Sequence, residues 1–237
     1  MSLLRRRLML MKQTKDKEYI EFADAEVERI CVANWSSDGV GLTYDDAAKV
    51  TDIGTKFRDN SVITSFDEFR YFTSVTNVPY AGFRQCKLMT HITLPDSIVT
   101  LNSYAFYRCY ALTDLDTNNV TSVGANAARE CSALASVNAP YATSIGDSAL
   151  RSNLKLMAIK LPSATSIAQY ALYDLKALQV LVLGAASVCT APASGFLTNV
   201  PTSCKIYVPG SLVDSYKATS PWSTRASQIY PLSEYTD

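Results

Sequence analysis

The sequence predicts an α/β repeat fold: a solenoid whose short strands stack into a parallel ladder, preceded by a small helical N-terminal region. Three observations support this prediction. A unit of about 22 residues recurs along the C-terminal two thirds of the chain. Apolar residues make up 48% of the sequence, enough to fill a continuous core. A helix–loop–helix pattern precedes the first unit.

Each unit is recognised by a column of residues at fixed steps. The column contains Cys86, Cys109, Cys131, Asn153 and Leu175, so its steps are 23, 22, 22 and 22 residues. Apolar or small residues recur three, six and eight positions later. These positions hold Met89, Leu112, Leu134, Leu156 and Leu178; Ile92, Leu115, Val137, Ile159 and Leu181; and Leu94, Thr117, Ala139, Leu161 and Leu183. A degenerate unit around residues 53–66 precedes these five.

The spacing inside a unit indicates its local structure. Pairs such as Ile159 and Leu161 flank one polar residue, which is typical of a short strand with one buried face. Residues 105–112, Ala-Phe-x-x-Cys-x-x-Leu, have the three-and-four spacing of one or two helical turns. One unit cannot bury its own apolar face, so neighbours must stack, with strands roughly 4.8 Å apart. The column cysteines are expected to be free, packed thiols, because no CxxC pair occurs and Asn153 and Leu175 replace them later.

These motifs resemble a known repeat family. The resemblance is carried by Ala105-Phe106-Tyr107-Arg108-Cys109 with Leu112 and Leu115, by Leu94-Pro95-Asp96-Ser97-Ile98, and by Lys205-Ile206-Tyr207-Val208-Pro209 with Tyr216-Lys217 and Trp222-Ser223. The sequence is similar to the BspA-like leucine-rich repeats, found in bacterial surface proteins and in gut-associated phage and protist proteins. This resemblance implies a leucine-rich-repeat solenoid closed by a C-terminal cap, with a strand at 206–208 and a helix near 212–217. It implies a scaffold, not a particular activity.

Two short helices are expected before the repeats. The first runs from Asp24 to Ala33 with Asp24 as its N-cap, and the second begins at Thr43, which caps it. The buried face of the first would hold Val27, Ile30 and Cys31.

The loop between these helices, residues 34–46, has the layout of an EF-hand calcium loop. Whether Gly39 or Gly41 is taken as its invariant glycine, the remaining positions depart from the calcium-binding pattern. We therefore expect a degenerate loop that caps the first repeat with Trp35 and Tyr44. Calcium binding in a defective register is the alternative.

Charge distinguishes the extreme N-terminus from the rest of the chain. The 22 basic and 22 acidic residues cancel, which disfavours a nucleic-acid partner. Residues 1–17, however, contain six basic residues and one acid, and fit a short basic amphipathic helix that either frays or anchors the chain on a partner subunit or an anionic surface. The candidate anchor residues are Leu4, Arg5, Arg6, Arg7, Leu8 and Met11. The sequence contains no recognisable secretory signal and no stretch apolar enough for a membrane span.

Catalytic patterns are absent from the sequence. His91 is the one histidine, and neighbouring units place Asp, Ser, Ala and Val at its position. No P-loop, GxGxxG or zinc-ligand spacing occurs. We predict no enzyme, cofactor or metal site; a hydrolase with His91 as its base is the remaining alternative.

A contact surface is expected on the outward residues of the strand ladder. One row holds His91, Asp114, Ser136, Ala158 and Val180, and the other holds Thr93, Asp116, Asn138, Lys160 and Val182. The rows become apolar towards Val180 and Val182, which suggests an assembly contact there and a possible homo-oligomer.

The predicted organisation is a basic segment at 1–17, a helix–loop–helix cap at 18–52, the solenoid at 53–203 and a C-terminal cap at 204–237. The residues 1–7 look like the opening of phage particle proteins. We therefore expect a non-enzymatic virion component, made in the host cytoplasm, for decoration, fibre or tail structure or receptor binding. Its partners would be other virion proteins or a host surface protein or glycan. The alternative is a bacterial cell-surface or intracellular interaction or adhesion protein.

Overall fold

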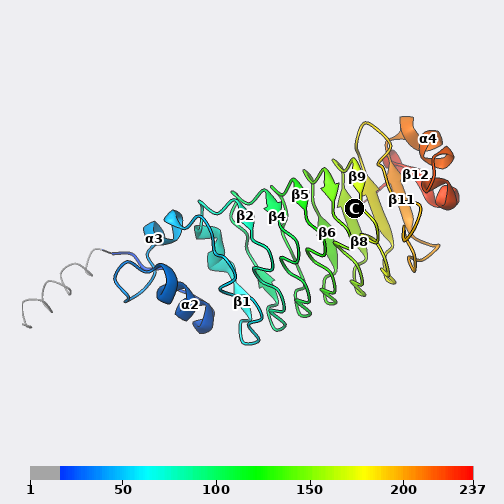
Figure 1. Ribbon diagram of the computed structural model, residues 1–237. Coiled ribbons are helices and arrows are strands. Elements are labelled where there is room, and N and C mark those ends of the chain that lie inside the picture. Colours follow the sequence, from blue (N-terminus) through cyan, green and yellow to red (C-terminus); the bar gives the residue numbers. More distant parts are fainter. Residues whose placement is uncertain (1–16, 237) are drawn as a thin grey trace, which may run out of the picture.

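The structure is a computed structural model that describes residues 17–236 as a row of stacked coils (Figure 1). Helices α2 (Ala25–Trp35) and α3 (Tyr44–Lys49) lie at one end of the row, and α4 (Val213–Ala218) lies at the other. The predicted α/β repeat solenoid is confirmed. The candidate anchor residues Leu4, Arg5, Arg6, Arg7, Leu8 and Met11 lie outside the described residues.

Helix α2 begins where the sequence predicts it. The Asp24 side chain accepts hydrogen bonds from two amides of the first turn. Its other oxygen accepts from the amide and hydroxyl of Thr64, at 2.7 and 2.8 Å, so one carboxylate ties the helix to the first coil. The helix buries Val27, Ile30 and Cys31, as predicted.

The N-terminal helices cover the aromatic core of the first coils. Trp35 packs against Phe57 and Phe72 with ring centroids 6.1 and 5.6 Å apart. Tyr44 meets Tyr71 edge-on at 4.7 Å. The exposed end of a solenoid needs such a cap, because its apolar face has no neighbouring repeat.

The first strand ladder contains the first residue of four of the five predicted Ile-x-Leu pairs, namely Ile92, Val137, Ile159 and Leu181. Its strands are β1 (Ser65–Phe66) paired with β3 (His91–Ile92), followed along the stack by β6 (Ser136–Asn138), β8 (Ala158–Leu161), β10 (Val180–Leu183), β11 (Lys205–Val208) and β12 (Ile229–Pro231). All pairings are parallel. The register places Val137, Ile159 and Leu181 side by side, so the inward column is continuous.

A second parallel ladder, which the sequence analysis did not predict, forms another side of the stack. It contains β2 (Asn77–Val78), β4 (Thr100–Leu101), β5 (Ser122–Val123), β7 (Ser144–Ile145) and β9 (Ser166–Ile167). Each strand has one buried residue, and these residues lie in register along the ladder, as Leu101, Val123 and Ile145 show. Two-residue strands are too short to show an alternating pattern in the sequence.

The prediction of a helical turn in each unit is wrong. Residues 102–112 and their equivalents form consecutive turns. Tyr104 and Arg108 both have left-handed backbones, each with φ of 61°, at a cost of roughly 1–2 kcal/mol per residue. The amides of Tyr104, Phe106 and Arg108 donate to carbonyls of the next coil at 3.0, 2.7 and 2.9 Å. A helix would use those amides internally, so the turns are favoured by hydrogen bonding between coils.

The C-terminal cap has its strand and helix where the family resemblance places them, in β11 and α4. Three short helical turns belong to this cap: η2 (Gly210–Leu212), η3 (Trp222–Gln228) and η4 (Leu232–Glu234). A fourth, η1 (Asp67–Tyr71), follows β1 near the N-terminal end of the stack. The buried Trp222 ring donates to the Cys189 carbonyl at 2.6 Å, and the Cys189 amide donates to the Tyr216 hydroxyl at 2.8 Å. Both rings therefore seal the last coil. Within residues 17–236, no helix is long and apolar enough to cross a membrane.

Candidate binding surface

The two predicted contact rows lie along the outward side of the first ladder, but their exposure differs. The exposed members are His91, Asp114, Asp116, Ser136 and Asn138, and the half-buried members are Thr93, Ala158, Lys160 and Val180. Val182 is buried. The accessible part of the surface is therefore its polar, N-terminal half.

At the N-terminal end of this surface, His91 is held by Asp67. The His91 Nε2 lies 2.8 Å from one Asp67 oxygen, and the Thr93 hydroxyl donates to the other at 2.9 Å. The His91 Nδ1 lies 3.1 Å from the hydroxyl of Thr90, which also donates to the Thr64 carbonyl. An Asp–His–hydroxyl series resembles a nucleophilic triad, but the hydroxyl proton is directed at a backbone carbonyl. The His91 side chain is 50% exposed, so water surrounds it.

In the middle of the surface the first ladder is interrupted. Residues 113–118 form no strand, although Leu115 occupies its core position. The Asp116 carboxylate accepts from the Asn118 amide at 2.9 Å, and the Thr117 hydroxyl donates to the Asn138 carbonyl at 2.7 Å. These side-chain bonds compete with the ladder, so the strand between β3 and β6 is lost.

The interruption leaves a depression of about 250 Å³. It is lined by Asp114, Leu115, Asp116, Asn118, Ser136 and Asn138. Four of these were predicted contact residues, and the structure brings them together. Asn118 was missed, because it lies outside both rows and reaches the depression only through the turn at Asp116. Neither Asp114 nor Asp116 forms an ion pair within the described part of the chain.

The expected apolar assembly contact at Val180 and Val182 must be corrected for Val182, which is only 6% exposed. In the ladder, Val182 lies between Lys160 and Tyr207. The ring of Tyr235 packs against Tyr207 with centroids 5.1 Å apart, and the Lys160 ammonium lies 5.5 Å from the same ring. The C-terminal segment therefore folds back onto both ladder neighbours of Val182, a long-range contact that a repeat pattern cannot reveal.

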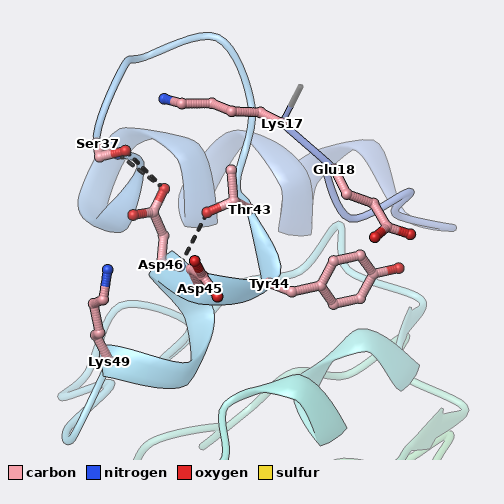
Figure 2. Close-up of a pocket in the computed structure, with 8 residues that line it drawn as sticks. All are labelled: Lys17, Glu18, Ser37, Thr43, Tyr44, Asp45, Asp46 and Lys49. Carbon is pink, nitrogen blue, oxygen red and sulfur yellow. Dashed lines mark hydrogen bonds between the residues drawn. The ribbon is translucent and has the colours of Figure 1, made fainter. Parts of the chain in front are cut away.

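The helix–loop–helix cap contains a polar pocket of about 420 Å³ (Figure 2). Its lining includes Lys17, Asp45, Asp46 and Lys49, so both charge signs face it. The Asp46 carboxylate accepts from the amide and hydroxyl of Ser37 at 3.2 and 3.0 Å (Figure 2).

Asp38, the central acid of the EF-hand-like loop, is satisfied by protein donors. One oxygen accepts from the Lys17 ammonium at 2.6 Å and the Tyr19 hydroxyl at 2.9 Å, and the other from the Val40 amide at 2.9 Å. These interactions, above all the hydrogen bond from Lys17, hold the pKa of Asp38 well below its usual range. No group of three or more His, Cys, Asp or Glu is placed to hold a metal in the described ranges.

The cysteine column is more than inert packing. The thiols of Cys86, Cys109 and Cys131 donate to carbonyls of the preceding coil at 3.1, 3.0 and 3.1 Å. Asn153 takes the same role in the next coil, donating to the Ala128 carbonyl at 3.0 Å. Burial raises the pKa of Cys86 to about 12, which makes it a poor nucleophile at neutral pH.

Three solved leucine-rich-repeat structures are similar to the chain. A protein of Bacteroides ovatus is 20% identical with a TM-score of 0.35, over 62% of this chain and 43% of its own. One of Treponema pallidum is 20% identical with a TM-score of 0.41, over 75% and 82%. A leucine-rich cell surface protein of Faecalibacterium prausnitzii is 14% identical with a TM-score of 0.24, over 70% and 62%. The chain thus spans less than half of the Bacteroides ovatus protein. No curated protein matches it.

A family model gives the assignment. The model of the BspA type leucine rich repeat region matches residues 51–179 in six copies, more than half of the sequence. This range contains the interrupted coil, the whole second ladder and the first-ladder strands β1, β3, β6 and β8. The chain belongs to the BspA-type leucine-rich-repeat family.

Proposed function

We propose that this chain is a non-enzymatic interaction or adhesion protein that binds a protein or glycan partner through the outward side of its first ladder. The depression at the ladder interruption carries this proposal. It gathers exposed carboxylate, amide and hydroxyl groups at one place on an otherwise regular surface. Such a site suits hydrogen-bond recognition.

The charge of the depression specifies what a partner must offer. Asp114 and Asp116 present exposed carboxylates without an ion pair within residues 17–236. Asn118, Ser136 and Asn138 add neutral donors and acceptors. The favoured partner surface therefore carries N–H or O–H donors, as basic protein segments and sugar hydroxyls do.

A binding role agrees better with the site chemistry than catalysis does. The His91, Asp67 and Thr90 series is exposed to water, and its hydroxyl bonds to the Thr64 carbonyl. Nucleophilic catalysis requires the base to accept the proton of the nucleophile. Full retention of any activity found for the chain in His91→Ala would exclude His91 as its catalytic base.

Cross-linking would test the surface directly. A photoreactive residue at Asn138, in the depression, should capture the partner when the chain is produced in its native source. The same residue at exposed Tyr141, outside the two contact rows, is the matched control. Specific adducts at position 138 alone support the proposal, whereas equal adducts at both positions contradict it.

The biological setting is proposed as either a virion or a bacterial cell surface. The family resemblance covers both settings, and the short basic start resembles phage particle proteins. Density-gradient fractionation of the native source, with peptide mass spectrometry of each fraction, distinguishes them. Comigration with intact particles at fixed stoichiometry favours the virion component; recovery with cell envelopes favours the bacterial adhesion protein.

A further inference from the structure

A row of arginine and tyrosine side chains follows the turns, on a side of the stack separate from the first ladder. Each member lies two residues before the cysteine column or its equivalent. The row, called here the arginine–tyrosine ridge, contains Arg58, Arg84, Tyr107, Arg129, Arg151 and Tyr173.

The ridge is ordered by stacking between coils. The Arg129 guanidinium lies 5.7 Å from the Tyr107 ring centre, one coil away. The Arg151 guanidinium lies 4.7 Å from the Tyr173 ring and 5.7 Å from the Tyr170 ring. Cation–π contact of this kind fixes the plane of a guanidinium before any ligand arrives.

The ridge carries more positive than negative charge, because its acids are shared. Asp59 lies 3.2 Å from both Arg58 and Arg84. Glu130 is likewise shared, at 2.8 Å from Arg108 and 3.1 Å from the adjacent Arg129. Asp59 and Glu130 therefore each leave one positive charge unbalanced, whereas Asp174, beside Tyr173, is paired with Lys176 at 3.4 Å.

Arg151 has no acid partner among the described residues. Its guanidinium forms no hydrogen bond or ion pair with any residue of the described range 17–236. Its Nε is buried, so its two Nη groups are the donors that a ligand can reach. A stacked arginine with unused donors is preorganised to bind an anion with two parallel hydrogen bonds.

We propose that the ridge binds an acidic polysaccharide whose sugars carry carboxylates. Arg151 would hold a carboxylate, Arg129 would add positive charge one coil away, and the Tyr173 ring would pack against the apolar face of a sugar. The tyrosine rings interleaved with the arginines favour a sugar over an extended acidic peptide, because the apolar face of a sugar can pack against an aromatic ring.

Isothermal titration of the full chain with polygalacturonate at low salt tests this inference. Methyl-esterified polygalacturonate is the ligand control, because it has the same sugars without charge. We expect binding of the acid form only, weakened by added salt. Arg151→Gln should weaken binding at least tenfold, whereas Lys155→Gln, which removes an exposed charge of the same coil, should change it less than twofold.

Two further variants separate specific from general effects. Arg151→Lys keeps the charge but loses the planar fork, so it should also weaken binding, and Tyr173→Leu should do so without a charge change. Thermal melting by circular dichroism shows whether each variant is folded. Asp116→Asn should leave polygalacturonate binding unchanged, so this inference and the proposed function can fail separately.

The inference is overturned by several results. These are no binding of polygalacturonate, equal binding of the esterified polymer, full binding by Arg151→Lys, or tighter binding of polyglutamate or single-stranded DNA. The last outcome would identify the ridge as a general anion or nucleic-acid surface.

Discussion

Leu134→Ala tests the register of the stack most directly. Leu134 is 0% exposed and lies in the central coil of its column, between the equally buried Leu112 and Leu156. The substitution removes three carbon atoms, which costs about 2.4 kcal/mol at about 0.8 kcal/mol per buried methylene. The cavity adds to this cost when its walls cannot collapse.

Collapse is restricted here because the neighbouring coils are held in register by backbone hydrogen bonds. The Leu134 amide closes a turn with Cys131, and the Ala133 amide donates to the preceding coil at 3.1 Å. We therefore expect a loss between about 2.4 kcal/mol and about 5 kcal/mol in the free energy of unfolding. Urea denaturation followed by circular dichroism measures this loss, provided the urea dependence is unchanged.

Leu154→Ala is the matched control for this measurement. Leu154 is the same residue type but is 47% exposed, so its truncation should cost less than about 1 kcal/mol. If Leu134→Ala and Leu154→Ala lower the free energy equally, the assignment of Leu134 to a packed inward column is incorrect.

Three further predictions concern the thiols, the loop and the asparagine of the column. Burial raises the pKa of the Cys204 thiol to about 12, whereas the pKa of a thiol in the unfolded chain is about 8.5. The contribution of the buried neutral thiol to the free energy of unfolding is therefore complete below pH ~8.5 and is lost as the pH rises. Cys204→Ala should reduce the fall in unfolding free energy between pH ~8.5 and ~9.5 by about 1 kcal/mol, and identical falls in both proteins would contradict the burial. Calcium at millimolar concentration should not raise the melting temperature in scanning fluorimetry, because donors already occupy the Asp38 carboxylate; a rise of several degrees would show a working calcium loop. Asn153→Ala should lower the free energy of unfolding in urea by about 1–3 kcal/mol, because two buried carbonyls lose their hydrogen-bond donor. Asn153→Cys should lower it by less, because the thiol can donate to the Ala128 carbonyl. Equal losses for the two variants would mean that the donor does not matter.

The candidate site was only partly predictable. The outward rows follow from strand alternation, so residues such as Ser136 and Asn138 could be placed on one surface from the repeat alone. The depression could not be predicted, because it depends on Thr117 and Asp116 using side-chain bonds in place of a ladder. The ridge was missed because stacking of Arg151 on Tyr173 is a contact between coils, across residues 22 positions apart.

By itself, the sequence determined the repeat length, the inward columns, the caps at Asp24 and Thr43 and the two N-terminal helices, while the C-terminal helix was implied by the family resemblance. These features are recorded locally, since each depends on spacing within one unit or one helix turn. Only the tertiary structure decided that residues 102–112 form turns, that a second ladder exists and that Tyr235 packs against Tyr207. The turns exchange bonds within their own segment for bonds with another coil, and the second ladder and the Tyr235 contact join segments that are distant in the sequence. That choice depends on the free energy of the assembled stack, which no single repeat contains.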